Sequence, residues 1–446
     1  MNFTPKFILL ILVALVVVAI TSNYLLITHF NDLTHHEDML HERLGVINAQ
    51  SIVNGLTEGK EEILKILLNS GAEVTSEIVE KLPTMEDFTS MYGPKQKIIG
   101  LETCENFRSN VSPQEAIIGP AGVYNTGTNL ISQLLMKHCV MKERAEVYDQ
   151  SHPSSNRDGS DEEGPVGVRT GMFNDVPWGK HGPILWRTDE DYRPEAFEIN
   201  QVFPNTKYQN VFPIVMVKDP FSWMGSMCRQ SYGALWLHSP QSCLNLNEEY
   251  DRLNALYNSN NPDRKVRKRI KSHKSMKFVS APEKKTVEKK VGLTIEYQND
   301  NNRWKRQVEY GDFVDLWNTF YRDYLNADFP HLIVRYEDLL LHADEVIPQI
   351  CECVGGEVTN AENRVHIGKD SAKETRTFGK TDNLVESLIR YGSSELRTER
   401  HSKGDIVYAI ENLGKDLMEI FHYEYPQIIE FEEEETFQIQ NPGVGK

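Results

Sequence analysis

The sequence has few cysteines, no surplus of positive charge and no internal repeats. Six cysteines in 446 residues are too few for a disulfide scaffold, and they suit a large domain with one or two bridges. The formal net charge of −17 argues against a general nucleic-acid-binding protein, because such proteins are normally basic. We therefore expect no nucleic-acid partner, although a local basic pocket for a small anion is compatible with this charge.

Apolar residues are numerous enough for a sizeable core. Hydrophobic residues make up 39% of the sequence and aromatic residues 9%, and a chain of 446 residues can hold two or three domains. Cys228 and Cys243 lie close together in the sequence, just after a predicted helix. In an oxidising compartment they can form a disulfide, and two free buried thiols are the alternative.

The N-terminal region carries a long apolar stretch. Residues 7–20 are uninterrupted apolar, Lys6 precedes them, and apolar residues resume at 24–27 after a short polar break. A span of roughly twenty residues can cross a bilayer. We predict a transmembrane signal-anchor at 7–28, which makes the membrane a partner and leaves residues 1–6 cytoplasmic and the bulk lumenal. The alternative is a cleaved signal peptide with Ala19 near the cut.

The rest of the chain divides by composition. Residues 29–110 are polar with helix-like periodicity at 61–68, and we predict a stem or helical region there. A catalytic-type domain is expected at 115–427, with a basic insertion at 258–303, and residues 428–446 form an acidic tail. Asn110-Val111-Ser112 is an N-glycosylation sequon, which has meaning only on a lumenal side.

A glycine-rich stretch at 117–129 predicts a strand, a tight turn and a helix whose first turn holds Thr128 and Asn129. Such a turn presents backbone N–H groups and the positive end of a helix dipole to one point, which can bind phosphate. Gly122 and Gly127 allow the backbone to approach an anion closely and to adopt positive φ. The alternative is an ordinary strand–turn–helix connection.

A second anion-binding element is predicted further along the chain. Residues 211–217 form a near-continuous apolar run, typical of a buried parallel strand, and Lys218 follows it. Asp219 and Pro220 suit the cap and first turn of a helix at 221–229. Ser226 lies eight residues after Lys218, two turns into the following helix. The lysine cation and the serine hydroxyl can therefore bind the same phosphate.

Further elements complete an α/β pattern. We predict an amphipathic helix at 312–326, a second buried strand at 331–340 that turns into a helix, and a helix at 404–425. Strands alternating with helices imply a parallel α/β sheet, in which the carboxyl ends of strands meet at one edge. Thr128 and Lys218 are therefore expected at the same edge.

With these motifs the chain resembles the sulfotransferases that use 3′-phosphoadenosine 5′-phosphosulfate. The resemblance spans about residues 115–425 and includes the similar strand–helix junction at Arg335 to Leu339. It implies a three-layer P-loop-like fold with a central parallel sheet flanked by helices, and this nucleotide as co-substrate; no metal is predicted. The implied nucleotide-binding residues are Gly122, Asn125, Thr126, Gly127, Thr128, Asn129, Lys218 and Ser226.

The sequence departs from the family pattern at two positions. Asn125 stands where the family often has a lysine that bridges the phosphate and the sulfuryl group, and Lys218 stands where arginine is usual. Lys180 is our candidate for the missing cation, with a solvated surface lysine as the alternative. His181 is our candidate base, because a neutral imidazole can accept a hydroxyl proton; a structural turn histidine is the alternative.

Several other residues have simpler interpretations. Arg229 can contact the nucleotide, but a helix-surface arginine is the preferred interpretation, and Trp223, Trp236 and Trp317 are expected in the core. Glu337 and Asp338 can form a carboxylate pair, although helix capping explains Asp338 more simply. Residues 369–380 hold several cations in a predicted final nucleotide-contacting segment.

The predicted function is transfer of a sulfuryl group to a hydroxyl or amine, with a carbohydrate acceptor in the Golgi or another secretory-pathway membrane. The very basic stretch 264–290 is either a solvated insertion or an arm that steers an anionic glycan acceptor. Three rivals remain. They are a catalytically silent nucleotide- or glycan-binding protein on the same fold, a P-loop kinase-like enzyme in which Thr128 replaces the motif lysine, and a membrane-anchored scaffold that works through its basic arm.

Overall fold

The computed structural model describes residues 57–72, 74–151, 166–188, 207–236, 238, 243–246, 292–298, 305–359 and 384–427. The predicted anchor at 7–28, the basic stretch 264–290, the cationic segment 369–380 and the acidic tail lie outside these residues. Among the described residues, no helix is both long and apolar enough to span a membrane. The chain forms two compact units, one of residues 1–86 and 366–392 and the other of residues 87–365 and 393–446.

The smaller unit contains short helices. Its described helices are α2 (Glu61–Asn69), α3 (Ser76–Lys81) and α16 (Leu384–Tyr391). Helix α2 buries Ile63, Leu64 and Leu67 completely, as expected from the apolar spacing of its sequence, so the predicted helix at 61–68 is confirmed. Helix α4 (Met85–Tyr92) begins at the boundary between the units.

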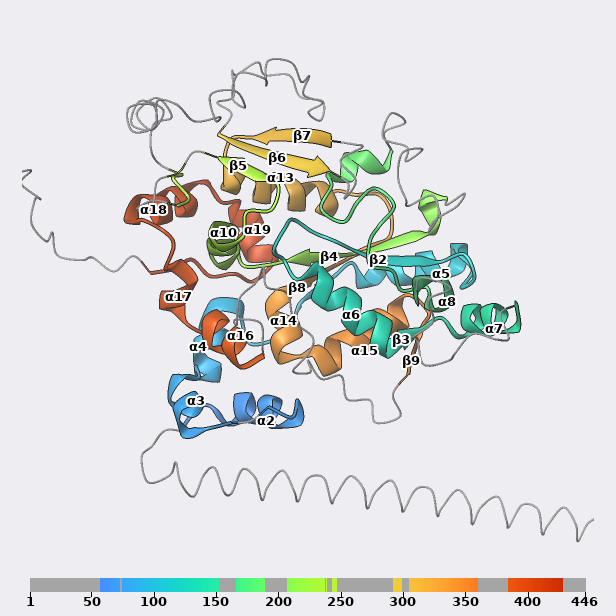
Figure 1. The fold of residues 1–446 in the computed structure, drawn as a ribbon, viewed down its shortest axis with the longest axis horizontal. Helices are drawn as coiled ribbons and strands as arrows, with labels where there is room; N and C mark the ends of the chain where they lie inside the picture. Colours follow the sequence, from blue (N-terminus) through green and yellow to red (C-terminus); the bar gives the residue numbers. More distant parts are fainter. Residues whose placement is uncertain are drawn as a thin grey trace, which may run out of the picture. The chain divides into compact units, whose positions relative to one another are not determined.

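The larger unit is built on a four-stranded sheet in the order β1-β8-β4-β2 (Figure 1). The strands are β1 (Ile98–Ile99), β8 (Leu332–Arg335), β4 (Val211–Val217) and β2 (Ile117–Ala121). Strand β4 pairs in parallel with both β2 and β8, and all its residues are buried. The predicted α/β class with parallel strands is confirmed, with one correction: edge strand β1 runs antiparallel to β8, so the sheet is mixed.

The helices after the parallel strands lie on both sides of this sheet. In the view of Figure 1, α10 (Pro220–Arg229) and α13 (Phe313–Leu325) lie above the strands, and α6 (Thr128–His138) and α15 (Ala343–Cys353) lie below them. The Asp219 carboxylate accepts a hydrogen bond from the Ser222 amide and caps α10, and Asp312 caps α13 in the same way. The predicted Asp219 cap is confirmed, whereas the Asp312 cap was not predicted.

One predicted helix was wrong in extent. Residues 404–425 form two helices, α18 (Lys403–Asn412) and α19 (Lys415–Ile420). Leu413 and Gly414 between them both adopt extended backbone angles, which end the first helix. Other elements of the larger unit are α5 (Cys104–Asn110), α7 (Lys142–Ser151), α8 (Val166–Thr170), α14 (Tyr336–Leu341), α17 (Ser394–Thr398), β3 (Cys139–Val140), β9 (Glu357–Val358), and 3₁₀ turns at Leu101–Thr103, Ile184–Arg187 and Tyr208–Asn210.

A second, antiparallel sheet has the order β5-β6-β7. Its strands are β5 (Ala234–Trp236), β6 (Leu293–Gln298) and β7 (Lys305–Tyr310). Strand β6 lies within the range 258–303 that was predicted as a basic insertion, yet it pairs on both sides and buries Leu293 and Ile295. The end of that range is therefore part of a folded sheet.

All six cysteines form disulfides, which are Cys104–Cys353, Cys139–Cys351 and Cys228–Cys243. The pairing of Cys228 with Cys243 is confirmed and the free-thiol alternative was wrong. The expectation of one or two bridges was also wrong, because the other four cysteines pair over long sequence separations that spacing does not reveal. Three disulfides indicate an extracellular or lumenal domain.

Candidate functional site

The chain winds outward from β2 and from β4 toward opposite edges of the sheet. After β2, the chain passes through α6 and returns beside β2 on its other flank, where Met172 forms a parallel bridge with Ile118. After β4, it passes through α10 and α13 to β8 on the opposite flank. In an open α/β sheet, ligands bind at the carboxyl ends of the strands where the winding reverses in this way. The glycine loop at 122–127 and Lys218 both lie at this point.

The glycine loop adopts backbone angles that require its glycines. Gly122 has φ +150° and Gly127 has φ +87°. A Cβ atom on Gly127 would lie 2.4 Å from the Tyr336 ring, and one on Gly122 would lie 2.7 Å from the Thr126 hydroxyl. The loop therefore follows a path that side chains at these two positions would block.

The loop leads directly into α6, whose first residue is Thr128 and whose N-cap is Gly127. The N-cap residue, a glycine, has no side chain that could cap this end of the helix. The first-turn N–H groups have no acceptor within the helix, and the dipole makes this end positive. Thr126, fully buried, donates its hydroxyl to the Val123 carbonyl and holds the loop closed. The segment therefore has the strand, tight turn and helix that the sequence predicted at 117–129.

Lys218 joins the two predicted anion-binding elements. It follows β4 and is only 3% exposed. Its Nζ lies 3.3 Å from the Ser226 hydroxyl and 3.4 Å from the Asn125 carbonyl, and 4.4 Å from the centre of the Tyr336 ring. The strand-end cation, the helix hydroxyl and the glycine loop thus meet at one place, as the spacing predicted.

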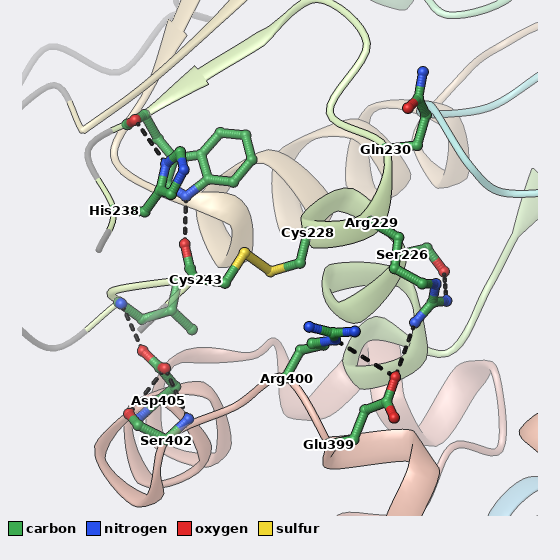
Figure 2. Close-up of a disulfide and its surroundings, with 12 residues drawn as sticks. Ser226, Cys228, Arg229, Gln230, His238, Cys243, Glu399, Arg400, Ser402 and Asp405 are labelled. Carbon is green, nitrogen blue, oxygen red and sulfur yellow. Dashed lines mark hydrogen bonds and ion pairs between the residues drawn. A yellow bond between two sulfur atoms is a disulfide. The ribbon is translucent and has the colours of Figure 1, made fainter. Parts of the chain in front are cut away.

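Arg229 is a member of this group that the sequence interpretation placed on the helix surface. Its Nη2 donates to the Ser226 hydroxyl at 2.8 Å (Figure 2). Ser226 in turn donates to the Ser222 carbonyl at 2.9 Å. The surface interpretation was incomplete, because the Arg229 side chain is 30% exposed but turns back onto Ser226. The available signal was the spacing of three residues, which puts both side chains on one face of α10.

The Asn125 side chain is hydrogen-bonded to the end of α10 and not placed as a phosphate-bridging lysine would be. Its backbone is left-handed, with φ +66°. Its side-chain amide donates to the Gln230 carbonyl at 2.7 Å and lies 3.1 Å from the Met227 sulfur. Asn125 therefore fastens the glycine loop to the end of α10, a structural task that the family comparison did not suggest.

Lys180 and His181 both contact the glycine loop. The Lys180 carbonyl accepts the Gly122 N–H at 2.7 Å, and the His181 Nδ1 lies 2.8 Å from the Gly122 carbonyl. Because a carbonyl only accepts, Nδ1 carries the proton, and a neutral ring then has its lone pair on Nε2. The Lys180 Nζ donates to the Asn129 side chain at 2.8 Å. All ten predicted site residues thus lie in or against one loop–helix junction.

The Asp175 carboxylate is hydrogen-bonded to the backbone of the segment that carries Lys180 and His181. It accepts the backbone N–H groups of Val176 and Lys180, so it fixes the turn that carries Lys180 and His181. Burial raises the pKa of Asp175 to about 6, and the nearby Lys180 charge opposes that rise. No sequence pattern pointed to Asp175, because its hydrogen-bond donors are backbone N–H groups, which almost any residue offers.

No protein-family model, curated protein or solved structure matches this chain. The site must therefore be judged by its own geometry.

Two buried ion pairs include residues at the carboxyl ends of β8 and β4. Arg335 pairs with Asp338 at 2.6 and 2.8 Å, and Arg397 pairs with Asp219 at 2.5 and 3.0 Å. Asp338 also accepts the Lys97 amide at 2.8 Å. The N-cap of α14 is Arg335, without a side-chain cap hydrogen bond, so the interpretation of Asp338 as a helix cap was wrong. These buried ion pairs, which are also hydrogen-bonded, fix the positions of α10, α14 and α17 near the site.

Glu337 has a different environment from its neighbour Asp338, so the two do not form a carboxylate pair. It is fully buried, accepts the Asp219 N–H at 3.1 Å and accepts the Tyr423 hydroxyl at 2.9 Å. Burial, followed by the negative charge of Asp219, raises the pKa of Glu337 to about 7.

The tryptophans behave mainly as core residues, as expected. Trp223 and Trp317 are fully buried, and their indole N–H groups donate to the carbonyls of Tyr124 and Lys218. They therefore also fix the backbone of the glycine loop and of the end of β4. Trp236 is only half-buried, and its indole N–H donates to the Cys243 carbonyl at 2.6 Å.

Proposed function

We propose that this chain is a sulfotransferase that takes its sulfuryl group from 3′-phosphoadenosine 5′-phosphosulfate. One observation carries the proposal: the Lys218 Nζ lies 3.4 Å from the carbonyl of Asn125 and 3.3 Å from the Ser226 hydroxyl. A nucleotide phosphorylated at two separate positions needs two anion sites close together. The glycine loop with the α6 N-terminus supplies one, and Lys218 with Ser226 supplies the other.

In this proposal the 5′-phosphosulfate lies on the backbone N–H groups of the loop, around Gly127 and Thr128. The 3′-phosphate lies against Lys218 and Ser226. Lys180, held near the first turn of α6 by Asn129, supplies the positive charge that Asn125 lacks. Such donors stabilise the negative charge that grows on the leaving phosphate during transfer.

His181 accepts the acceptor's proton. The acceptor hydroxyl loses its proton to Nε2 while its oxygen bonds to sulfur. The bond between sulfur and the bridging oxygen of the 5′-phosphate breaks, and its electron pair stays with the leaving 3′-phosphoadenosine 5′-phosphate. The proton on the imidazolium then passes to solvent. The hydrogen bond to the Gly122 carbonyl holds the ring in the tautomer that this step needs.

The acceptor we propose is a carbohydrate of the secretory pathway, and the location a Golgi or related membrane with the catalytic domain lumenal. Three disulfides support an oxidising compartment. The apolar N-terminal sequence supports a single-pass type II anchor, and the basic stretch 264–290 suits an anionic glycan.

The test is calorimetric binding of 3′-phosphoadenosine 5′-phosphate to the full chain, purified oxidised in detergent. Lys218→Ala and Ser226→Ala should each weaken binding, by about 10-fold or more for the lysine. Lys137→Ala is the matched control, because Lys137 is exposed at the far end of α6. A folded wild-type chain that does not bind the nucleotide would overturn the proposal.

The second candidate is a binding protein without transfer activity. It is favoured by the Asn125 side chain, which is engaged with the end of α10 and leaves the loop without a lysine. Transfer of labelled sulfate from 3′-phosphoadenosine 5′-phosphosulfate to a mixed glycan pool separates the two. Tight nucleotide binding with no transfer to any glycan would favour the silent binder.

A further inference from the structure

Tyr124, inside the glycine loop, is the centre of a cluster of aromatic rings. Its ring centroid lies 5.1 Å from that of Tyr232, with an angle of 11° between the two ring planes. The Tyr297 centroid lies 6.1 Å away with an angle of 22°, and the His181 ring lies 4.3 Å away. The candidate base and two stacked tyrosines therefore belong to one aromatic cluster.

Tyr232 is the tyrosine of this cluster that reaches the surface. It is 42% exposed, although its ring is stacked on Tyr124. Tyr297 is buried, and the buried Trp186 packs edge-on against it at 4.9 Å. Among the residues that the structure describes, the other exposed large apolar side chains come from different elements: Leu101, Val147, Leu185 and Ile420. One exposed ring offers an area that suits a ligand ring, whereas a stable protein interface takes about 800 Å² from each partner.

The backbone holds Tyr232 in place against the preference of its side chain. Its φ of +47° is left-handed, a region that disfavours bulky residues. The Ala234 N–H donates to the Ser231 carbonyl at 2.8 Å, so Tyr232 lies in a tight turn that leads into β5. The next residue, Gly233, lies so close to the Glu296 carbonyl on β6 that a Cβ atom would collide with it. Strain of this kind, at a turn that presents an exposed ring, indicates a use for that ring.

An exposed tyrosine ring suits a sugar as its ligand. A pyranose has C–H bonds on its faces and hydroxyls around its edge, so one face can stack on an aromatic ring while the hydroxyls stay in water. An aryl acceptor stacked on the same ring would leave its second apolar face in water, and small apolar ligands are instead enclosed in pockets. A sugar ring is therefore the better occupant of this surface.

We propose that Tyr232, supported by Tyr124, is the binding platform for the acceptor, and that the acceptor is a pyranose stacked by its C–H face on the Tyr232 ring. This inference rests on the proposed function and deepens it, because the acceptor is then selected by the face of a sugar ring and a neutral glycan qualifies as well as an anionic one. Tyr124 contacts both Tyr232 and His181. A sugar on Tyr232 therefore holds a hydroxyl of the same glycan near the candidate base.

The experiment titrates the full oxidised chain with three neutral trisaccharides, built from β-linked galactose, β-linked glucose and α-linked mannose. Binding is followed by saturation-transfer nuclear magnetic resonance, with and without 3′-phosphoadenosine 5′-phosphate, in a detergent that has no sugar headgroup. Mannitol, which has hydroxyls but no ring, is the control ligand. We expect at least one trisaccharide to bind, with the strongest signals from the C–H protons of one ring face, and mannitol not to bind. Equal binding of mannitol would overturn the inference.

Tyr232→Gly separates a ligand platform from a packing residue. Glycine accepts the left-handed backbone, so the melting temperature should change by no more than about 3 °C although the ring stacking is lost. Binding of the trisaccharide should weaken about 5- to 10-fold. Tyr232→Phe keeps the ring and should retain binding within about 2-fold. Val147→Ala, which shortens an exposed apolar side chain on α7, is the matched control and should leave binding unchanged.

Nucleotide affinity distinguishes the possible failures. If Tyr232→Gly weakens binding of 3′-phosphoadenosine 5′-phosphate and not of the sugar, the ring stacks on adenine and the inference is overturned. Sugar binding that is unchanged in Tyr232→Gly, or that falls only together with the melting temperature, also overturns it. A wild type that binds no nucleotide overturns the proposed function, whereas a wild type that binds the nucleotide and none of the three sugars overturns only this inference.

Discussion

Replacing Gly127 by alanine is the sharpest test of the glycine loop. Two costs arise from the structure. The left-handed backbone at φ +87° disfavours alanine by about 1–2 kcal/mol. The new Cβ atom would also lie 2.4 Å from the Tyr336 ring, and overpacking of this kind costs about 1–3 kcal/mol. We expect Gly127→Ala to lower the free energy of unfolding of the larger unit by roughly 2–5 kcal/mol.

Gly355 provides a control in the same unit. It has φ +79°, but the nearest atom to an added Cβ is the flexible Arg108 Cδ at 3.4 Å. Gly355→Ala therefore carries the backbone cost alone, about 1–2 kcal/mol. Urea unfolding followed by near-ultraviolet circular dichroism measures both variants. Because the chain has two units, the transition must be assigned to the larger one before free energies are compared.

A double variant isolates the steric part. Tyr336→Ala removes the ring, so Gly127→Ala should cost less in that background than in the wild type. A cost of Gly127→Ala no larger than that of Gly355→Ala, or a cost that is the same with and without the Tyr336 ring, would show that the ring does not restrict position 127. Nucleotide affinity should fall with Gly127→Ala even in molecules that remain folded, because the displaced loop moves the α6 N-terminus.

Three further predictions concern pH, catalysis and the Cys228–Cys243 disulfide. The folded pKa of Glu337, about 7, lies above the ordinary value of 4.5, so its stabilisation is fully present below pH 4.5 and lost as pH rises through 7. Glu337→Gln, which mimics the protonated acid, should flatten that part of a stability–pH profile, and an unchanged slope would contradict the assignment. His181→Gln should reduce sulfuryl transfer about 100-fold or more while nucleotide affinity changes little, and equal losses in both would argue against a base. The double variant Cys228→Ser/Cys243→Ser should weaken bisphosphate binding several-fold, because the bridge anchors the last turn of α10 beside Arg229, and unchanged affinity would show that the helix needs no such anchor.

Local patterns predicted the elements that carry the site. The strand–turn–helix at 117–129 and the strand–helix at 211–229 follow from apolar runs, glycines and the Asp219 cap, all of which act over short stretches. The meeting of Lys218 with the loop also followed, because parallel strands present their carboxyl ends at one edge. Physical rules of short range thus predicted the elements that form the candidate anion site.

Contacts over long sequence separations could not be predicted in this way. Glu399 reaches Arg229 from 170 residues away, and Asp338 receives the Lys97 amide across 241 residues. The role of Asn125 could not be predicted for the same reason, because its partner is the backbone carbonyl of Gln230, the residue that follows α10, and a backbone carbonyl has no sequence signature. Four of the cysteines likewise allow several pairings, and only the tertiary structure selects one.

The two long-range disulfides impose an order on biosynthesis. Cys351 and Cys353 lie two residues apart on α15, yet they bind Cys139 and Cys104 across sequence separations of 212 and 249. During synthesis, Cys104 and Cys139 remain thiols until Cys351 and Cys353 have been translated near the end of the domain. Cys228 and Cys243, separated by 15 residues, can form their disulfide earlier. Exchange of the two partners on α15 would produce a scrambled isomer of the same mass. Production of active protein should therefore depend on a host with disulfide isomerase, and fragments that end before Cys351 should be prone to covalent aggregation.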